Sequence, residues 1–320
     1  MLIPNMRLFY GKYEREVYMD KTMKILIAGS NGMVGSAVTR HLIESGHEVI
    51  RLVRHTPGTG EVWWDPDGGE IDKANLDGFN GVVHLASMPW PMRWTNKAKQ
   101  MIRLNRLGTN RLLAESLAGC ETKPQVLICA SGMGYYPSSG DTVLTEDSPA
   151  GTSFIASLQR DGEAATAPAS QAGIRVVHLR IPPVLGGAAL QRIGFQPGDG
   201  QQWASWVGRD ELASIIEFAL TAESLTGPVN AVSPNPMRYA DFTQAASQAL
   251  GQKSGGTMPA FLVRLIMGEM GEELLLSSRR MQPAKLLAAG YQFRFPELEG
   301  ALRYEMECMH AGVAVKEIQP

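Results

Sequence analysis

The sequence contains few cysteines and lacks any close pair of them. Cys120, Cys129 and Cys308 are odd in number and form no close pair, so they offer no disulfide framework. This pattern is typical of a reduced compartment, and we expect a cytoplasmic protein. The six histidines show no metal-ligand spacing with the cysteines or the acids, so no metal site is predicted.

Long apolar runs and an excess of charge of one sign are also missing. The longest apolar candidate, residues 261–267, is interrupted by Arg264 and is shorter than the ~20 residues of a membrane helix. With 30 basic and 32 acidic residues the formal net charge is −2, so there is no general basic field for nucleic acid. We therefore expect neither a membrane nor a nucleic acid as partner.

Glycine, by contrast, is abundant, and three glycines follow the first apolar strand in the spacing G-x-x-G-x-x-G. Gly29 would allow a sharp exit from the strand, Gly32 would let the backbone approach a pyrophosphate, and Gly35 would let the next helix pack closely. Free N–H groups at the start of that helix would hold the anion. The sequence therefore predicts a dinucleotide site formed by Gly29, Ser30, Asn31, Gly32, Met33, Val34 and Gly35.

The second strand, residues 48–53, bears on which dinucleotide binds. Sites for NAD usually carry an acid about 20 residues after the glycines, at the end of this strand. Here Arg54 follows the strand, and its acid, Glu48, lies at the opposite end. A planar guanidinium suits a 2′-phosphate, so NADP(H) is favoured over NAD(H); a solvated loop arginine is the alternative. Backbone after the fourth strand could line the adenosine or the nicotinamide ribose, at Leu85, Ala86 and Ser87.

Strands alternate with helical patterns from Lys24 to about Val232, which is typical of an α/β fold with a doubly wound parallel Rossmann sheet. A smaller C-terminal α/β domain would cover the carboxyl edge of the sheet, with a ligand in the cleft between the two parts. We predict a disordered extension, or a start codon assigned too far upstream, for residues 1–22; a Rossmann domain at 23–232, with 182–202 contributing to the substrate side; a small domain at 233–305; and a tail at 306–320.

Several further stretches share a family pattern, at residues 82–87, 93–106, 131–136, 227–236 and 259–296. Over residues 23–303 the sequence resembles the extended and atypical short-chain dehydrogenase/reductases, and among them an uncharacterised, epimerase-like, NADP-binding subgroup with its own C-terminal domain. The resemblance implies a Rossmann fold, a nicotinamide cofactor and a small-molecule substrate. It says much less about the reaction.

The acid–base pair of the wider superfamily is missing from this chain. There a Tyr-x-x-x-Lys pair on the helix after the fifth strand transfers the proton, because the lysine lowers the pKa of the tyrosine. In this sequence the helix at residues 154–163 has no tyrosine, and Gln159 stands about where the lysine would be if Glu163 sets the register. The subgroup also lacks the pair.

Ser131 and Tyr136, just after the fifth strand, are the predicted catalytic residues. Ser131 could hold a substrate carbonyl near the nicotinamide, although a serine that only closes the strand fits equally well, and Gly132 could occupy its place in the family register. Tyr136 could replace the missing acid, but tyrosines also form pocket walls. His84, in the fourth strand, fits a hydrogen-bonded core histidine better than a functional one.

The leading interpretation is an NADP-dependent oxidoreductase, similar to nucleoside-diphosphate-sugar epimerases, that acts on an unknown small metabolite. The alternative is a non-catalytic protein that binds NADPH for regulation, having lost the Tyr/Lys pair. The sequence leaves a homodimer open, since the apolar residues at Met267, Met270 and 274–276 fit either a core or a dimer interface.

Overall fold

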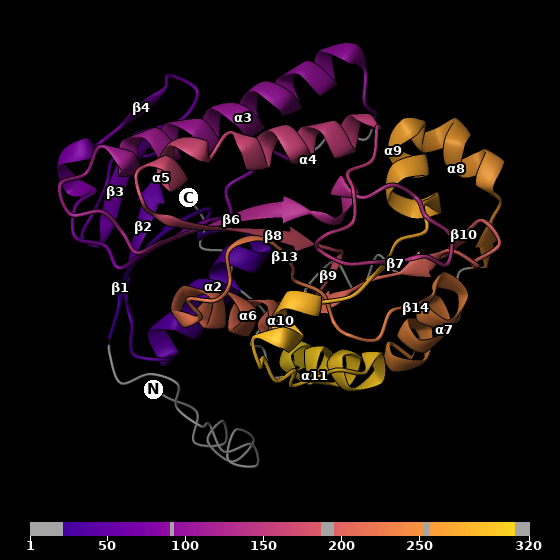
Figure 1. The fold of residues 1–320 in the computed structure, drawn as a ribbon. Helices are drawn as coiled ribbons and strands as arrows, with labels where there is room; N and C mark the ends of the chain where they lie inside the picture. The colour runs from indigo at the N-terminus through magenta and orange to yellow at the C-terminus, as the bar shows by residue number, and fades with distance from the viewer. Residues whose placement is uncertain (1–21, 90–92, 187–194, 252–255, 311–320) are drawn as a thin grey trace.

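The computed structural model describes residues 22–89, 93–186, 195–251 and 256–310. The predictions for residues 1–21 and for the tail beyond 310 therefore lie outside the described residues. The centre of the structure is an eight-stranded sheet with the order β13-β8-β6-β5-β1-β2-β3-β4 (Figure 1). Its strands are β1 (Lys24–Ala28), β2 (Glu48–Val53), β3 (Glu61–Asp65), β4 (Glu70–Ile71), β5 (Gly81–His84), β6 (Val126–Gly132), β8 (Arg175–Ile181) and β13 (Gly227–Asn230).

The strand order places a crevice beside the first strand. Six strands in the order β3-β2-β1-β5-β6-β8 reproduce the 3-2-1-4-5-6 arrangement of dinucleotide-binding folds, and β13 extends the sheet in parallel beyond β8. The antiparallel pair β3–β4 closes the opposite edge. The order reverses between β1 and β5, so a ligand is expected at the carboxyl ends of these two strands. The predicted fold class is confirmed.

Both faces of the sheet are buried, as the alternation in β1 shows. Ile25 and Ile27 point into the core under α2 and α6, whereas Leu26 and Ala28 point into the core under α3 and α5. A strand covered on both faces needs apolar residues at every position, which explains its continuous apolar run. The covering helices form two layers (Figure 1): α2 (Met33–Glu44) and α6 (Arg209–Thr221) on one face, and α3 (Asn96–Ala118), α4 (Phe154–Ala164) and α5 (Ala167–Gln171) on the other.

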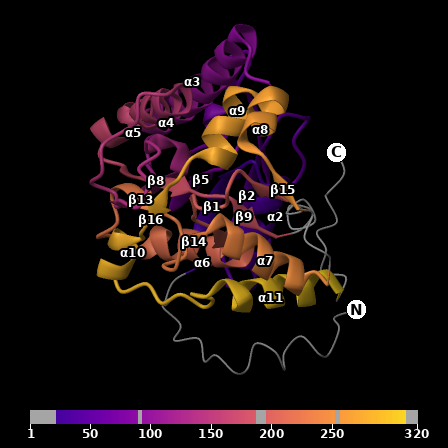
Figure 2. The same cartoon turned by 90° about the vertical axis from the view of Figure 1, so that its right-hand side faces the viewer.

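A smaller domain stands beyond the carboxyl ends of the strands. Its core joins Trp206 and Phe242 to Leu298, so segments on both sides of residue 233 build it. In Figure 2, α8 and α9 lie above the ends of the strands, and α7 and α11 lie below them. The helices are α7 (Tyr239–Ala249), α8 (Ala260–Met267), α9 (Glu269–Gly271), the π-helical turn η4 (Glu272–Leu276), α10 (Ala284–Ala288) and α11 (Leu298–His310).

Four pairs of very short strands connect this domain to the Rossmann part. One of them, β16 with β7, ties the C-terminal domain to the segment that follows β6. The remaining elements are the pairs β9 (Val184–Leu185) with β12 (Val207–Gly208), β10 (Gln196–Pro197) with β15 (Thr257–Met258), β11 (Trp203–Ala204) with β14 (Met237–Arg238) and β16 (Arg280–Met281) with β7 (Val143–Leu144), and the 3-10 turns η1 (Lys73–Asn75) and η2 (Met133–Tyr135). Within the described ranges, no helix combines the length and the apolar character needed to cross a membrane. The predicted domain boundaries stay a prediction.

Candidate dinucleotide-binding site

The glycine turn lies directly against the end of β5. Gly29 leaves β1 with φ +85°, a conformation that disfavours any side chain, and a Cβ at this position would stand 2.6 Å from the nitrogen of Ala86. The two backbones can approach this closely because Gly29 has no side chain. The turn and the predicted segment after β5, which begins with Leu85, therefore meet at the switch point of the sheet.

Gly35 is also required by the fold. A Cβ there would lie 1.9 Å from the carbonyl oxygen of Gly29, and no shift of a side chain could relieve that clash because the obstacle is backbone. Helix α2 therefore packs against the turn it follows, which is the close packing that the motif predicts. Close backbone contacts within the chain therefore explain why the first and third positions of the motif, Gly29 and Gly35, are glycine.

Gly32 differs from the other two glycines, because no contact within the chain requires glycine at this position. Its φ of −72° and ψ of 168° suit any residue, and a Cβ would meet one atom within 4 Å, the Gly29 oxygen at 3.5 Å. Gly32 caps the 12-residue helix α2, which begins without a side-chain cap and without an acid in its first turn. An exposed glycine at an uncapped helix start leaves free N–H groups that suit a pyrophosphate. These residues fit a dinucleotide.

Arg54 is exposed just after β2 and forms no ion pair or hydrogen bond with the rest of the described chain. Its neighbour Arg51 differs, because its guanidinium lies 2.7 Å from the carboxylate of Glu61. Glu61 is fully engaged: it also accepts a hydrogen bond from the backbone N–H of Gly58 at 2.8 Å and contacts His55 at 3.2 Å. The bond from Gly58, with weaker help from the neighbouring cations, lowers the pKa of Glu61. The acid nearest the end of β2 thus has its own partners, and Arg54 has none.

Ser131 lies near the end of β6, where it is tied to helix α4. Its hydroxyl donates to Glu163 Oε1 at 2.7 Å and contacts Gln159 Oε1 at 3.4 Å. Arg180 from β8 holds the same carboxylate in a two-pronged contact, with Nε and Nη2 each 3.0 Å from an oxygen of Glu163. The predicted serine therefore stands in a connected polar group that spans β6, β8 and α4.

Tyr136 is completely buried. Its hydroxyl donates to Asn230 Oδ1 at 2.7 Å and accepts from Arg180 Nη1 at 2.8 Å. Burial raises the pKa of Tyr136 to about 12, against the opposing effect of Arg180. The Tyr136 hydroxyl is thus engaged within the fold by two hydrogen bonds, and the proton-donor role expected for it stays a prediction. Sequence spacing could not reveal this burial, since it depends on β8 and β13.

A search against protein-family models matches residues 25–231 to the NAD dependent epimerase/dehydratase family, and residues 258–305 to a domain of unknown function, DUF1731. The chain belongs to the NAD dependent epimerase/dehydratase family. This confirms the resemblance inferred from the sequence.

Family relatives span nearly the whole chain. An epimerase family protein of Mycobacterium leprae is 36% identical over 88% of this chain and 94% of its own length. The crystal structure of the human epimerase family protein SDR39U1 with NADPH shares 30% identity and a TM-score of 0.81, over 89% of this chain and 99% of that one. A nucleoside-diphosphate sugar epimerase from Corynebacterium glutamicum shares 35% identity and a TM-score of 0.76, over 89% of this chain, which spans 58% of that longer protein.

Sequence reasoning missed three polar residues of this epimerase-family chain: Arg106, Arg180 and Asn230. Arg180 and Asn230 are buried at 2% and 0% exposure, and both belong to the group around Ser131 and Tyr136. A charged residue at the end of a predicted buried strand was the available signal for Arg180. Arg106 on α3 ends one of the stretches that carry the family resemblance, but that resemblance assigned it no role.

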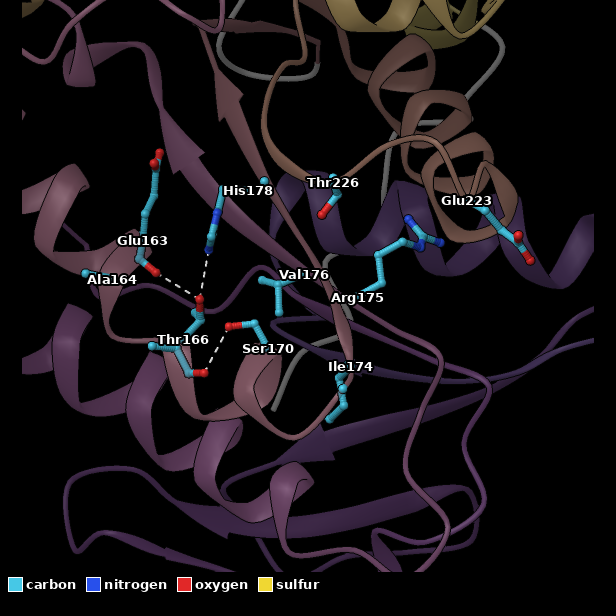
Figure 3. Close-up of a pocket in the computed structure, with 13 residues that line it drawn as sticks. Glu163, Ala164, Thr166, Ser170, Ile174, Arg175, Val176, His178, Glu223 and Thr226 are labelled. Carbon is cyan, nitrogen blue, oxygen red and sulfur yellow. Dashed lines mark hydrogen bonds between the residues drawn. The ribbon is translucent and has the colours of Figure 1, made fainter.

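A cavity of about 620 Å³ lies elsewhere, along the edge of the sheet beside β8 and β13 (Figure 3). None of the glycine-turn residues lines it. Several of its polar groups already have partners: Thr166 Oγ1 lies 2.8 Å from His178 Nε2, and Arg175 donates to backbone carbonyls, including that of Leu225 at 2.8 Å. Burial lowers the pKa of His178, which favours the neutral ring. Because these groups already have partners within the chain, the glycine turn is the stronger candidate for a ligand-binding site.

Proposed function

We propose that this chain is an NADP(H)-dependent oxidoreductase of the epimerase/dehydratase family that acts on a small metabolite. One observation carries the proposal: Gly32 is exposed, unstrained and uncrowded at the uncapped start of α2. The fold would tolerate a side chain there, so the bare backbone at this helix start leaves room for a ligand to approach its N–H groups. The presence of NADPH in the structure of the human relative supports the same cofactor.

The free guanidinium of Arg54 supports the choice of NADP(H) over NAD(H). It stands just after β2, where the ribose of the adenosine is held in this fold, and it lacks an acid to neutralise it among the described residues. A bidentate contact with a 2′-phosphate would satisfy it. The backbone at residues 29–35 would hold the pyrophosphate, and residues 85–87 would line a ribose.

When bound, the cofactor would supply hydride transfer, and the chain would orient the substrate. Ser131 is the proposed contact at the substrate end. Because its proton already goes to Glu163, its oxygen is available to accept a hydrogen bond from a substrate hydroxyl. To donate to a carbonyl instead, the hydroxyl must rotate away from Glu163. A cytoplasmic location and a homodimer stay predictions.

The experiment is a titration of the parent and of Arg54→Ala with NADPH and NADH. We expect the parent to prefer NADPH, and the variant to lose about 1.5 kcal/mol of NADPH affinity, roughly tenfold, with little change for NADH. Arg51→Ala is the matched control, since its charge is already paired with Glu61. Equal affinity of the parent for the two dinucleotides would refute the assignment.

The residues of helix α4 favour a second candidate function. In this alternative the chain is a regulatory protein that binds NADPH without turnover. With Gln159 at the position of the lysine, Ile155 takes the position of the tyrosine, and it is 2% exposed and packed against Gly134. An aliphatic side chain there supplies no proton. A panel of carbonyl and hydroxyl metabolites, followed by the absorbance of NADPH, separates the two: binding without turnover across the panel supports the regulatory candidate.

A further inference from the structure

Arg106 places a guanidinium beneath the end of β6. It comes from α3, which lies beside α4 over the sheet (Figure 1). Its Nη2 donates to the carbonyl oxygen of Ala130 at 2.5 Å and reaches Gln159 Oε1 at 3.4 Å. The same Gln159 oxygen lies 3.4 Å from the hydroxyl of Ser131. Arg106 is therefore separated from Ser131 by a single side chain.

No carboxylate of the described residues lies within ion-pair distance of this guanidinium, although Glu163 acts on it from farther away. Within the described residues Arg106 forms no ion pair, whereas its neighbours do: Arg180 pairs with Glu163, and on the same helix Arg103 pairs with Asp161. An arginine does not lose its proton in proteins, so Arg106 keeps its charge despite its burial. The end of β6 thus carries an excess positive charge.

The other titratable groups around Arg106 do not cancel this charge. Burial lowers the pKa of His84 to about 3, with help from Arg106 itself, so the ring is neutral. Burial raises the pKa of Cys129 to about 12, so the thiol is neutral as well. The carboxylate that acts on Arg106 is that of Glu163, and it is already held by Nε and Nη2 of Arg180. The carboxylate of Glu146 accepts a hydrogen bond from the backbone N–H of Asn230 in β13.

The position of this charge matters for a dinucleotide. In this fold the ligand crosses the switch point, so its adenosine half lies over β1 and β2 and its nicotinamide half lies over the ends of β5 and β6. The oxidised nicotinamide ring carries a positive charge and the reduced ring carries none. Away from water, a fixed cation near the ring acts over several ångströms because little solvent screens it.

We propose that the site distinguishes the redox state of its cofactor, and that Arg106 makes it bind NADPH more tightly than NADP⁺. This inference rests on the proposed NADP(H) site. It gives the chain the binding preference of a reductase, or of a protein that responds to the ratio of the two forms.

The test is a set of titrations of the full chain with NADPH, NADP⁺ and adenosine 2′,5′-bisphosphate. We expect the parent to bind NADPH about tenfold more tightly than NADP⁺, equivalent to ~1.4 kcal/mol. The bisphosphate carries the adenosine half alone and reports whether that half of the site is intact. If none of the three binds, the proposed function fails; if NADPH and NADP⁺ bind equally, the preference inferred here is overturned while the proposed function stands.

Variants of Arg106 then assign the preference to its charge. Arg106→Gln can still donate a hydrogen bond but is neutral, and we expect its affinities for NADPH and NADP⁺ to become nearly equal. Arg106→Lys keeps the charge and should keep the preference. Arg103→Gln is the matched control from the same helix, because the charge of Arg103 is already paired. Unchanged bisphosphate affinity shows that each variant is folded, and a preference that survives in Arg106→Gln contradicts the role of Arg106.

Discussion

At the scale of single residues, Tyr136 links three strands of the structure through one hydroxyl. The phenol follows β6, accepts from Arg180 in β8 and donates to Asn230 in β13. Because burial raises its pKa to about 12, the phenol stays protonated at neutral pH and can always donate to Asn230. These hydrogen bonds predict a contribution of Tyr136 to the stability of the fold.

Tyr136→Phe should therefore lower the free energy of unfolding by about 1–3 kcal/mol, since it leaves buried partners unsatisfied. Urea unfolding measures this. Tyr135→Phe is the matched control, because the Tyr135 hydroxyl has no hydrogen bond in the described structure, while its ring remains stacked 3.4 Å from the Arg180 guanidinium. Equal losses in the two variants would contradict the network, and NADPH affinity should be the same in both.

Residue types alone could identify the binding glycines, but not the polar group around Ser131. The glycines have a fixed spacing along the chain, and the role expected of each one depends only on its place in the motif. Arg180, Arg106 and Asn230 come from different elements, and only the packing of β6, β8, β13 and α3 brings them together. The sequence analysis named Ser131 as a candidate, but it did not predict the hydrogen bond of Ser131 to Glu163.

At the scale of elements, helix α11 places a buried acid, Glu305, against helix α6 of the Rossmann part. Glu305 is 1% exposed, its carboxylate lies 3.4 Å from Arg209 Nη2 on α6, and neither oxygen has a hydrogen-bond partner among the described residues. Burial raises the pKa of Glu305 from its ordinary value of 4.5 to about 7, although Arg209 opposes the shift. Asp210, Arg40 and Cys308 also face it.

The sign of the pH effect follows from this raised pKa. The folded chain holds the proton more tightly than the unfolded chain, so Glu305 costs nothing near pH 4 and destabilises the fold increasingly between about pH 4.5 and 7. Since one pKa unit corresponds to about 1.4 kcal/mol, the shift from 4.5 to about 7 sets an upper limit of about 3.5 kcal/mol on the cost above pH 7.

Glu305→Gln should thus raise the melting temperature at pH 8 and have little effect at pH 5. Thermal melts across this range measure it. Glu307→Gln, an exposed position on the same helix, is the control and should change neither value. A Glu305→Gln variant that is destabilised equally at both pH values would show that the pairing with Arg209 outweighs the burial.

Long elements were predictable from the sequence, and the short ones were not. Central strands such as β1 and β6 contain apolar runs because both faces of the sheet are covered there. The break between α4 and α5 falls beside Pro168, as the missing N–H of proline requires. The paired segments of the C-terminal domain are two residues long. They have no periodicity to read, and their pairing depends on the tertiary contacts of distant segments.

At the scale of the whole molecule, the fold concentrates its ligand chemistry at one edge. The uncapped start of α2, the exposed Arg54 and the polar group around Ser131 all lie at the carboxyl ends of parallel strands, and the smaller domain stands over that edge (Figure 2). The strand order puts the dinucleotide turn next to β5 at the switch point.

The most direct test of this account is NADPH titration of the parent and of Gly32→Val. A side chain at Gly32 meets almost nothing in the chain, so the variant should keep the circular dichroism and melting temperature of the parent. It should nevertheless bind NADPH at least about 100-fold more weakly, a loss of ~2.7 kcal/mol, because the side chain fills the space of the pyrophosphate. Gly35→Val provides the contrast, since its clash with Gly29 should damage the fold itself. A folded Gly32→Val variant that binds NADPH as tightly as the parent would contradict the placement of the site.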